Sequence, residues 1–186
     1  LNSEDSDINL ILAEVYDAIE RDEEAIEILQ KSLSISPGHL RSIYKIIDIY
    51  RKMAYARPED RAVTAKRENY LLELVKLAPG NIPVRLQLIE SLLTHGETDS
   101  ALAQMEVLIQ QIPEPPKEAS RAIRETLKQI QAGNNSMASR FFKVVHNVLK
   151  VTPRYQSGLW SLKGPGGAIT GFPILDFSEN LEQQMD

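Results

Sequence analysis

The sequence predicts an all-α fold: a right-handed α-solenoid of antiparallel helix hairpins that ends in an irregular, β-prone tail. Apolar residues recur at helical spacing from position 8 to position 151. Prolines at positions 37, 79, 113 and 153 end these stretches and lie 42, 34 and 40 residues apart. Two helices in each period of that size are typical of a helical repeat, in which every hairpin buries its apolar face against its neighbours.

The composition excludes several classes of protein. The chain has 186 residues and no cysteine, so disulfide scaffolds and cysteine-based metal sites are excluded. No apolar run is long enough to span a membrane. The net charge of −5 argues against nucleic acid as the main partner. Because the chain starts at Leu1 and shows no signal peptide, we expect a fragment of a larger protein, from either a cytoplasmic or an extracytoplasmic compartment.

The first hairpin is expected within residues 7–39. Apolar residues at helical spacing mark its first helix: Ile8, Leu12, Val15, Tyr16 and Ile19. Asp5 or Ser6 is the expected N-cap. A second apolar run, from Ala25 to Leu33, stops at Ser36-Pro37-Gly38, where proline cannot continue the helix and glycine accepts a left-handed turn.

The next two hairpins are expected within residues 40–81 and 82–114. The first of them is eight residues longer than the 34 residues of the other (42 − 34), so both of its helices should be extended. We expect its second helix to start at Arg57-Pro58-Glu59-Asp60, with the proline in the first turn. The shorter hairpin has a glycine turn at Gly96-Glu97 and ends at Pro113.

The fourth hairpin is expected within residues 115–153 and is followed by a tail of different character, residues 154–186. Pro115-Pro116 opens the first helix, and the turn falls at Ala132-Gly133-Asn134-Asn135. Five of the nine glycines lie in the tail. The segment from Trp160 to Gly171 predicts two short extended pieces around a Gly/Pro turn. The apolar segment Phe172–Phe177 suggests a docked cap or the start of a following domain.

Two of the hairpins carry a motif: a bulky and a small residue in the first helix, an aromatic or apolar one further on, a small residue in the second helix, and a closing proline. In residues 7–39 the motif positions are Leu12, Ala13, Tyr16, Ala25, Leu29, Ser32 and Pro37. In residues 82–114 they are Leu88, Ile89, Leu92, Ala101, Met105, Leu108 and Pro113. These residues resemble the tetratricopeptide repeat (TPR) family over about 147 of the 186 residues, with a partial match in the second hairpin.

The resemblance implies a non-catalytic protein-interaction module that binds a peptide, a helix or its own tail in a concave groove lined by the first helix of each hairpin. The groove positions are Asp7, Leu10, Glu14, Asp17, Arg41, Tyr44, Lys45, Asp48, Arg51, Lys52, Leu86, Gln87, Glu90 and Leu93. Leu10 and Glu14 disfavour the carboxylate clamp of the chaperone-binding branch. Arg41, Lys45, Arg51 and Lys52 could instead pair with an acidic segment of a partner. The alternative is that these are ordinary surface charges.

Other roles rest on fewer residues. The repeats could be an intramolecular scaffold for an adjacent domain, such as a β-propeller or an enzyme; Phe172–Phe177 faintly resembles the segment that precedes such propellers. RNA binding is disfavoured, because no basic or aromatic stripe is shared across the repeats. The histidines lack metal-binding spacing, and Gly164-Pro165-Gly166-Gly167 lacks the ending of a phosphate loop. No catalytic, cofactor or metal site is therefore expected, and the oligomeric state is left open.

Overall fold

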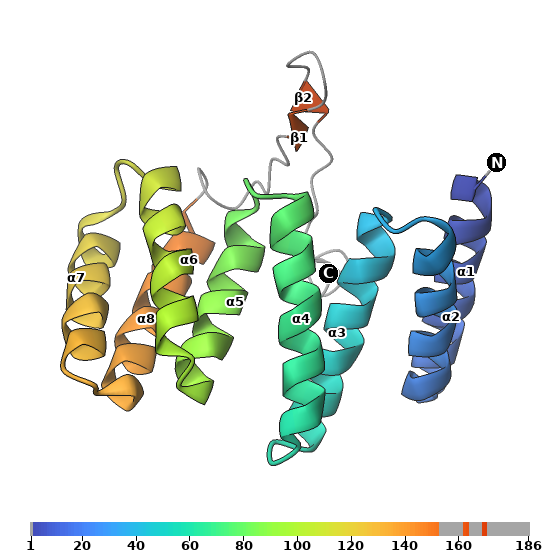
Figure 1. Ribbon diagram of the computed structural model, residues 1–186, viewed down its shortest axis with the longest axis horizontal. Helices are drawn as coiled ribbons and strands as arrows, with labels where there is room; N and C mark the ends of the chain where they lie inside the picture. The colour runs from blue at the N-terminus through green and yellow to red at the C-terminus, as the bar shows by residue number, and fades with distance from the viewer. Residues whose placement is uncertain (1, 153–161, 164–168, 171–186) are drawn as a thin grey trace, which may run out of the picture. The chain divides into compact units, whose positions relative to one another are not determined.

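The structure is a computed structural model that describes residues 2–152, with side chains from residue 5 on, and residues 162–163 and 169–170. Residues 2–152 form eight helices, which confirms the predicted all-α fold (Figure 1). The helices are α1 (Asn2–Ala18), α2 (Asp22–Ile35), α3 (Leu40–Ala56), α4 (Arg61–Leu77), α5 (Ile82–His95), α6 (Thr98–Gln111), α7 (Lys117–Gln131) and α8 (Asn135–Lys150).

The chain divides into two compact units, Leu1–Leu77 and Ala78–Asp186. The first contains α1 to α4 and the second α5 to α8, and in each unit helices that follow one another in sequence pack as pairs. The sequence predicted one array over residues 7–153. The division instead falls inside that range, at Ala78-Pro79-Gly80, where the proline follows the end of α4.

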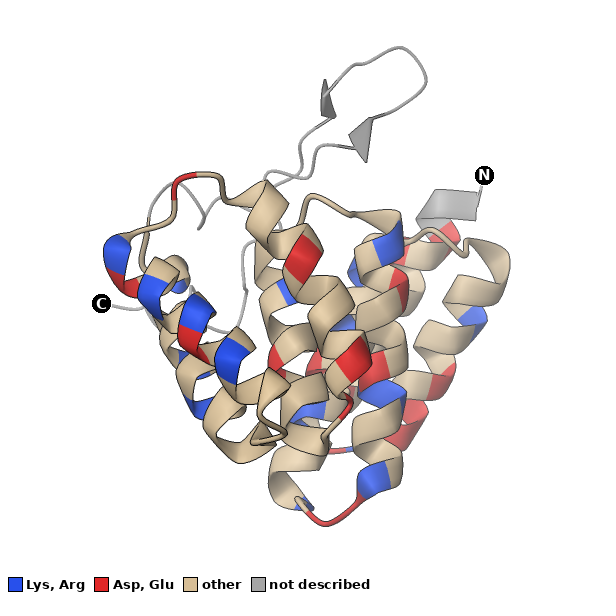
Figure 2. Ribbon diagram, turned by 60° about the vertical axis from the view of Figure 1, so that its left-hand side comes forward, with Lys and Arg blue, Asp and Glu red and all other residues tan. Residues whose placement is uncertain are grey.

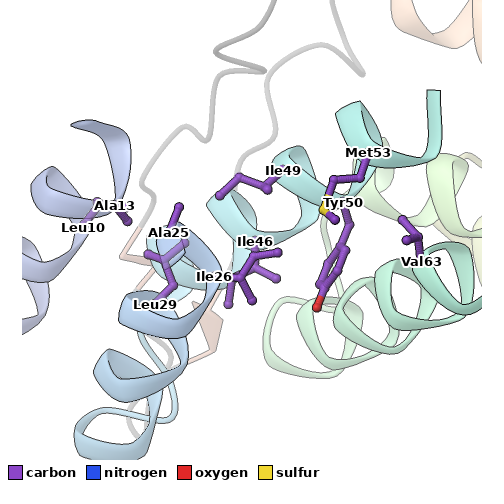
Figure 3. Close-up of a cluster of buried hydrophobic side chains, with 10 residues drawn as sticks. All are labelled: Leu10, Ala13, Ala25, Ile26, Leu29, Ile46, Ile49, Tyr50, Met53 and Val63. Carbon is purple, nitrogen blue, oxygen red and sulfur yellow. The ribbon is translucent and has the colours of Figure 1, made fainter. Parts of the chain in front are cut away.

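In the first unit, α3 joins the two helix pairs, because it packs against both α1 and α2 as well as its own partner α4. The small residues Ala13 and Ala25 are fully buried, as their place in the motif predicts, and Leu29 is buried between them and α3. Figure 3 shows this core: Leu10 and Ala13 of α1, Ala25, Ile26 and Leu29 of α2, Ile46, Ile49, Tyr50 and Met53 of α3, and Val63 of α4.

In the second unit the two helix pairs are joined differently. It is α8, the second helix of its pair, that packs on α5, whereas α7 makes no comparable contact with α5 or α6. The apolar side of α7 packs instead on α8, whose buried residues include the fully enclosed Phe142. The fourth pair therefore has the predicted hairpin but does not repeat the packing seen in the first unit.

The extra residues of the second pair lengthen its helices, as predicted. Both α3 and α4 have 17 residues, whereas α5 and α6 have 14. The expected start of α4 at 57–60 is wrong: the helix begins at Arg61. The side chain of Asp60 accepts hydrogen bonds from the backbone N–H groups of Ala62 and Val63, so Asp60 satisfies the first free donors and Pro58 stays in the turn.

Two other details of the helix ends differ from expectation. The first helix begins at Asn2, and Ser6 is buried inside it, so neither Asp5 nor Ser6 is its N-cap. Gly38 does not adopt a positive φ; among the glycines of residues 2–152, those that do are Gly96, at +80°, and Gly133, at +70°. Both of these end a helix in the left-handed conformation that glycine adopts without a steric cost.

The apolar spacing found in α1 marks an exposed face. Leu10 and Ala13 face the core, where α2 and α3 pack against them. This buried face is narrower than the exposed apolar face whose spacing predicts the helix. Four large aliphatic side chains on the other side of α1, and Ile19 directly after its end, are between 43% and 62% exposed. We call them the α1 stripe: Ile8, Ile11, Leu12, Val15 and Ile19.

The tail contributes one small element to the described structure. Strand β1 (Leu162–Lys163) pairs antiparallel with β2 (Ile169–Thr170), with Leu162 opposite Thr170 and Lys163 opposite Ile169. This agrees with the two extended pieces that the sequence predicted. The predictions for Trp160, for the Gly/Pro turn and for Phe172–Phe177 lie outside the described residues.

Candidate partner-binding surfaces

The predicted groove residues of the first unit form a set of ion pairs between α1 and α3. Arg41 of α3 donates from Nη1 to the Asp7 carboxylate of α1 at 3.3 Å, and His39 Nε2 lies 3.5 Å from the same oxygen. Nearly three turns further along α3, Arg51 donates to Asp48 of the same helix at 2.5 Å, so this pair lies within α3. The acidic first helix and the basic third helix therefore neutralise each other across their contact.

The most enclosed of these pairs is centred on Asp17, whose side chain is only 10% exposed. Its carboxylate accepts a hydrogen bond from Lys45 Nζ at 2.7 Å and another from Lys52. Burial by itself raises the pKa of Asp17, but the hydrogen bonds and charges of the two lysines outweigh it and hold the pKa below its ordinary value. Asp17 is thus an ionised anchor that ties α1 to α3.

These pairs change the expectation for an acidic partner. Each of the four cations offered to such a partner by the sequence already has a carboxylate partner in its own unit. An incoming acidic segment would have to displace these contacts, and at Asp17 it would leave a nearly buried carboxylate without its cations. The α1–α3 face is therefore a poor site for an acidic ligand.

Three predicted groove residues belong to the core instead. Leu10, Leu86 and Leu93 are at most 4% exposed, so the expectation that they line an open groove is corrected. Glu14 is exposed, and Tyr44 and Gln87 are half-buried. Helical spacing predicts which residues share one face of a helix, but it does not predict which face a neighbouring helix covers.

On α5, the predicted groove face is covered by α8. Glu90 Oε2 accepts a hydrogen bond from Nδ1 of His146 at 2.6 Å, and Thr94 Oγ1 lies 3.3 Å from the hydroxyl of Ser139. Leu86 and Leu93 lie four residues before and three residues after Glu90, on the same side of the helix. The fourth helix pair thus occupies the face that the resemblance assigned to a ligand, and His146 is a structural residue there.

A shallow cavity of about 310 Å³ lies among α2, α3 and α4. The rings of Tyr50 and Tyr70 stack with centroids 6.0 Å apart, and Gln30 Nε2 donates to the Tyr70 hydroxyl at 3.1 Å. Lys66, Asn69 and Glu73 complete the lining. Among the lining residues, Gln30, Tyr50 and Tyr70 are thus engaged with one another.

A basic row on α7 is the most distinctive charged feature of the second unit. Lys117, Arg121, Arg124 and Lys128 are exposed and spaced at i, i+4, i+7 and i+11, which places them within about 60° on one side of the helix. Figure 2 shows these basic positions following one another along α7. We call them the α7 row. None of the four has a carboxylate partner within residues 5–152.

The sequence contained the signal for this row, because the spacing can be read directly from residues 117–128. A comparison of the four hairpins does not reveal the row, because only one helix carries it. Glu118 and Glu125 also lie on α7, about 40–60° beyond the nearest edge of the row, and neither forms an ion pair with a row residue in the described part of the chain.

Neither a metal site nor a membrane span is found in the described part of the chain. No group of three or more histidine, aspartate or glutamate side chains there could hold a metal ion. No described helix is both long and apolar enough to cross a membrane.

No protein-family model matches the chain, and no curated protein matches it significantly. Membership of the tetratricopeptide repeat family therefore stays a prediction. The all-α fold of paired helices stands on the structure alone.

Proposed function

We propose that the protein is a non-catalytic protein-interaction module and that the α7 row binds an acidic segment of its partner. The observation that carries this proposal is the contrast between two sets of cations. Those of α3 are paired with Asp7, Asp17 and Asp48, whereas those of α7 are exposed and have no carboxylate partner in residues 5–152. Unlike the α3 cations, the four cations of the α7 row need not be displaced from an existing ion pair in the described residues before they meet an acidic ligand.

The spacing of the row specifies the ligand. Its ends are separated by about 16 Å along the helix axis. An acidic helix with carboxylates at the same i, i+4, i+7 and i+11 positions would place one carboxylate near each cation. Exposed ion pairs contribute about 0.2–1 kcal/mol each, so four of them give roughly 1–4 kcal/mol in total. The contact is therefore weak and sensitive to salt, and it steers and orients a partner that also binds elsewhere.

The test is a binding titration of the intact chain with a labelled helical peptide that carries glutamate at those four positions. We expect binding at low ionic strength that weakens as salt is added. Arg121→Glu with Arg124→Glu should weaken binding at least about tenfold, because attraction becomes repulsion at the centre of the row. Helicity should be unchanged, since both side chains are exposed.

The matched control is Arg41→Glu with Arg51→Glu, which reverses the same number of exposed arginines on α3. This control should bind the peptide like the unaltered chain. Loss of binding in the α3 variant and its retention in the α7 variant would contradict the proposal and return the site to the α1–α3 face. Tighter binding of an RNA strand of equal charge than of the peptide would also overturn it.

A further inference from the structure

The α1 stripe is a large apolar surface for one helix to expose. Its five aliphatic side chains lie within about 100° of the helix circumference. Single exposed aliphatic residues are ordinary on a protein surface, but a contiguous row of them marks a surface that another molecule or segment covers. The stripe lies in the first unit and the α7 row in the second, so variants of one leave the other intact.

The internal repeat of the chain shows what kind of element fits this stripe. A shift of 34 residues takes Tyr16 of α1 to Tyr50 of α3, and it also joins the ion-paired residues Asp7 and Arg41. The same shift takes Ile11 to Lys45, which is ion-paired with Asp17 and is not apolar. The other four stripe residues, Ile8, Leu12, Val15 and Ile19, correspond to Ser42, Ile46, Ile49 and Met53. The positions on α3 are at most 7% exposed, whereas those on α1 are at least 43% exposed.

A helix covers the equivalent face of α3. The Oγ atoms of Ser32 in α2 and Ser42 in α3 are 3.4 Å apart in a buried contact. Next to them, α2 and α3 contribute their aliphatic side chains to one core (Figure 3). Four of the five stripe positions thus have the spacing of the covered α3 face, with Ile8 in place of the smaller Ser42 at one end. An amphipathic helix is therefore the element that the stripe is shaped to receive.

The charged side chains beside the stripe determine whether the flanks of that helix should be basic or acidic. On the covered face, the acidic helix α2, with Asp22, Glu23 and Glu24 in its first turn, packs on the basic helix α3. Helix α1 has the opposite character: residues 2–18 include five acids and no basic residue. Asp5 borders one edge of the stripe and Glu14 lies about 60° beyond the other. Both are exposed, and neither has a partner in the described residues.

We infer that the α1 stripe is the docking face for an amphipathic helix with basic flanks, which packs on α1 as α2 packs on α3. The aliphatic side chains provide the affinity, because their burial removes apolar surface from water. Asp5 and Glu14 select a helix with lysine or arginine at its flanks and reject an acidic one. A second copy of α1 is disfavoured, since it would bring the same acids together.

A defined helix tests this inference. The probe is a synthetic peptide with the α2 sequence, residues 22–35, in which Asp22, Glu23 and Glu24 are replaced by lysine. A lactam bridge between Glu27 and Lys31, both exposed in α2, holds it helical. The reference peptide has the same bridge and keeps the three acids. Binding of each labelled peptide to the intact chain is measured by fluorescence anisotropy.

We expect the basic peptide to bind and the acidic peptide to bind at least about tenfold more weakly. Ile11→Gln with Val15→Gln should weaken binding of the basic peptide about tenfold or more, because it removes two exposed aliphatic groups without adding charge. Val144→Gln is the matched control, since Val144 of α8 is as exposed as Leu12 but lies in the other unit. It should change nothing.

Three results would overturn the inference. The first is equal binding of the basic peptide to the unaltered chain and to the double variant. The second is no binding of either peptide. The third is self-association of the unaltered chain in sedimentation equilibrium that the double variant abolishes, which would assign the stripe to a second copy of the chain.

Discussion

At the scale of single residues, two nearly buried charged groups are held in contrasting ways. Asp17 is ionised and paired with two lysines. Arg85 is 3% exposed and has no carboxylate partner in the described residues. Its guanidinium donates instead to the Pro79 carbonyl at 2.8 Å, to Gln111 Oε1 at 3.2 Å and to Gln104. Burial lowers the pKa of Arg85, but an arginine stays protonated, so neutral acceptors alone hold this charge.

Asp17→Asn should destabilise the first unit by roughly 1–3 kcal/mol at neutral pH, because the charged hydrogen bonds to Lys45 and Lys52 are lost. The folded-state pKa of Asp17 is lowered, so its contribution is present above the unfolded value of about 4 and is lost as the pH falls through the folded value. Urea unfolding at several pH values measures both effects.

The control for this prediction is Asp48→Asn, which breaks the more exposed pair with Arg51 and should cost less than about 1 kcal/mol. The Asp17 variant should also lose stability less steeply in acid than the unaltered chain. An acid dependence that is the same in both proteins would show that Asp17 is not the anchor.

Arg85→Lys should destabilise the second unit by about 1–3 kcal/mol, although it keeps the charge. One ammonium group cannot reach the three acceptors that the planar guanidinium joins, so at least one of these part-buried hydrogen bonds is lost. Arg121→Lys, at an exposed position in the same unit, should be nearly neutral. Equal stability of the two variants in thermal unfolding would mean that the fork of Arg85 is not needed.

At the scale of secondary structure, two glycines between helices differ in whether the backbone conformation requires glycine. Gly96 has a φ of +80°, and a Cβ there would lie 3.6 Å from Asn135 Nδ2. Gly38 does not have a positive φ, and a Cβ there would meet nothing within 4 Å. The same residue type thus has a conformational role at the α5–α6 turn and none at the α2–α3 turn.

Gly96→Ala should lower the free energy of unfolding by about 1–2 kcal/mol, because alanine is strained in the left-handed region. Gly38→Ala should be neutral or slightly stabilising, since it only reduces the freedom of the unfolded chain. Chemical denaturation of both variants provides the measurement. A cost at Gly38 as large as that at Gly96 would refute this assignment of the two turns.

The sequence predicted the helices much better than their contacts. Prolines and helical spacing indicated all four hairpins, because these signals act within a few residues of one another. The covered face of α1 could not be found in the same way: its apolar pattern was stronger on the exposed side, and Leu10 with Ala13 gave a weaker signal than the α1 stripe. The packing of α8 on α5 is likewise a tertiary choice that local spacing does not encode.

At the scale of the whole molecule, the uneven distribution of charge decides which surfaces are open to a partner. Residues 1–39 carry two basic and ten acidic side chains, and residues 113–153 carry seven basic and three acidic ones. Helix α3 neutralises part of the acidic segment through Asp7 and Asp17. The α7 row has no such counterpart in the described residues. The charges can be read from the sequence, but only the fold distinguishes paired charges from unpaired ones.

The most direct test of this account is hydrogen exchange of the intact chain with and without the four-glutamate helical peptide. We predict that the peptide slows exchange of backbone amides only in α7 and at the start of α8, and that this protection fades as salt is raised. Changes centred on α3, with α7 unaffected, would contradict the assignment of the acidic partner to the α7 row.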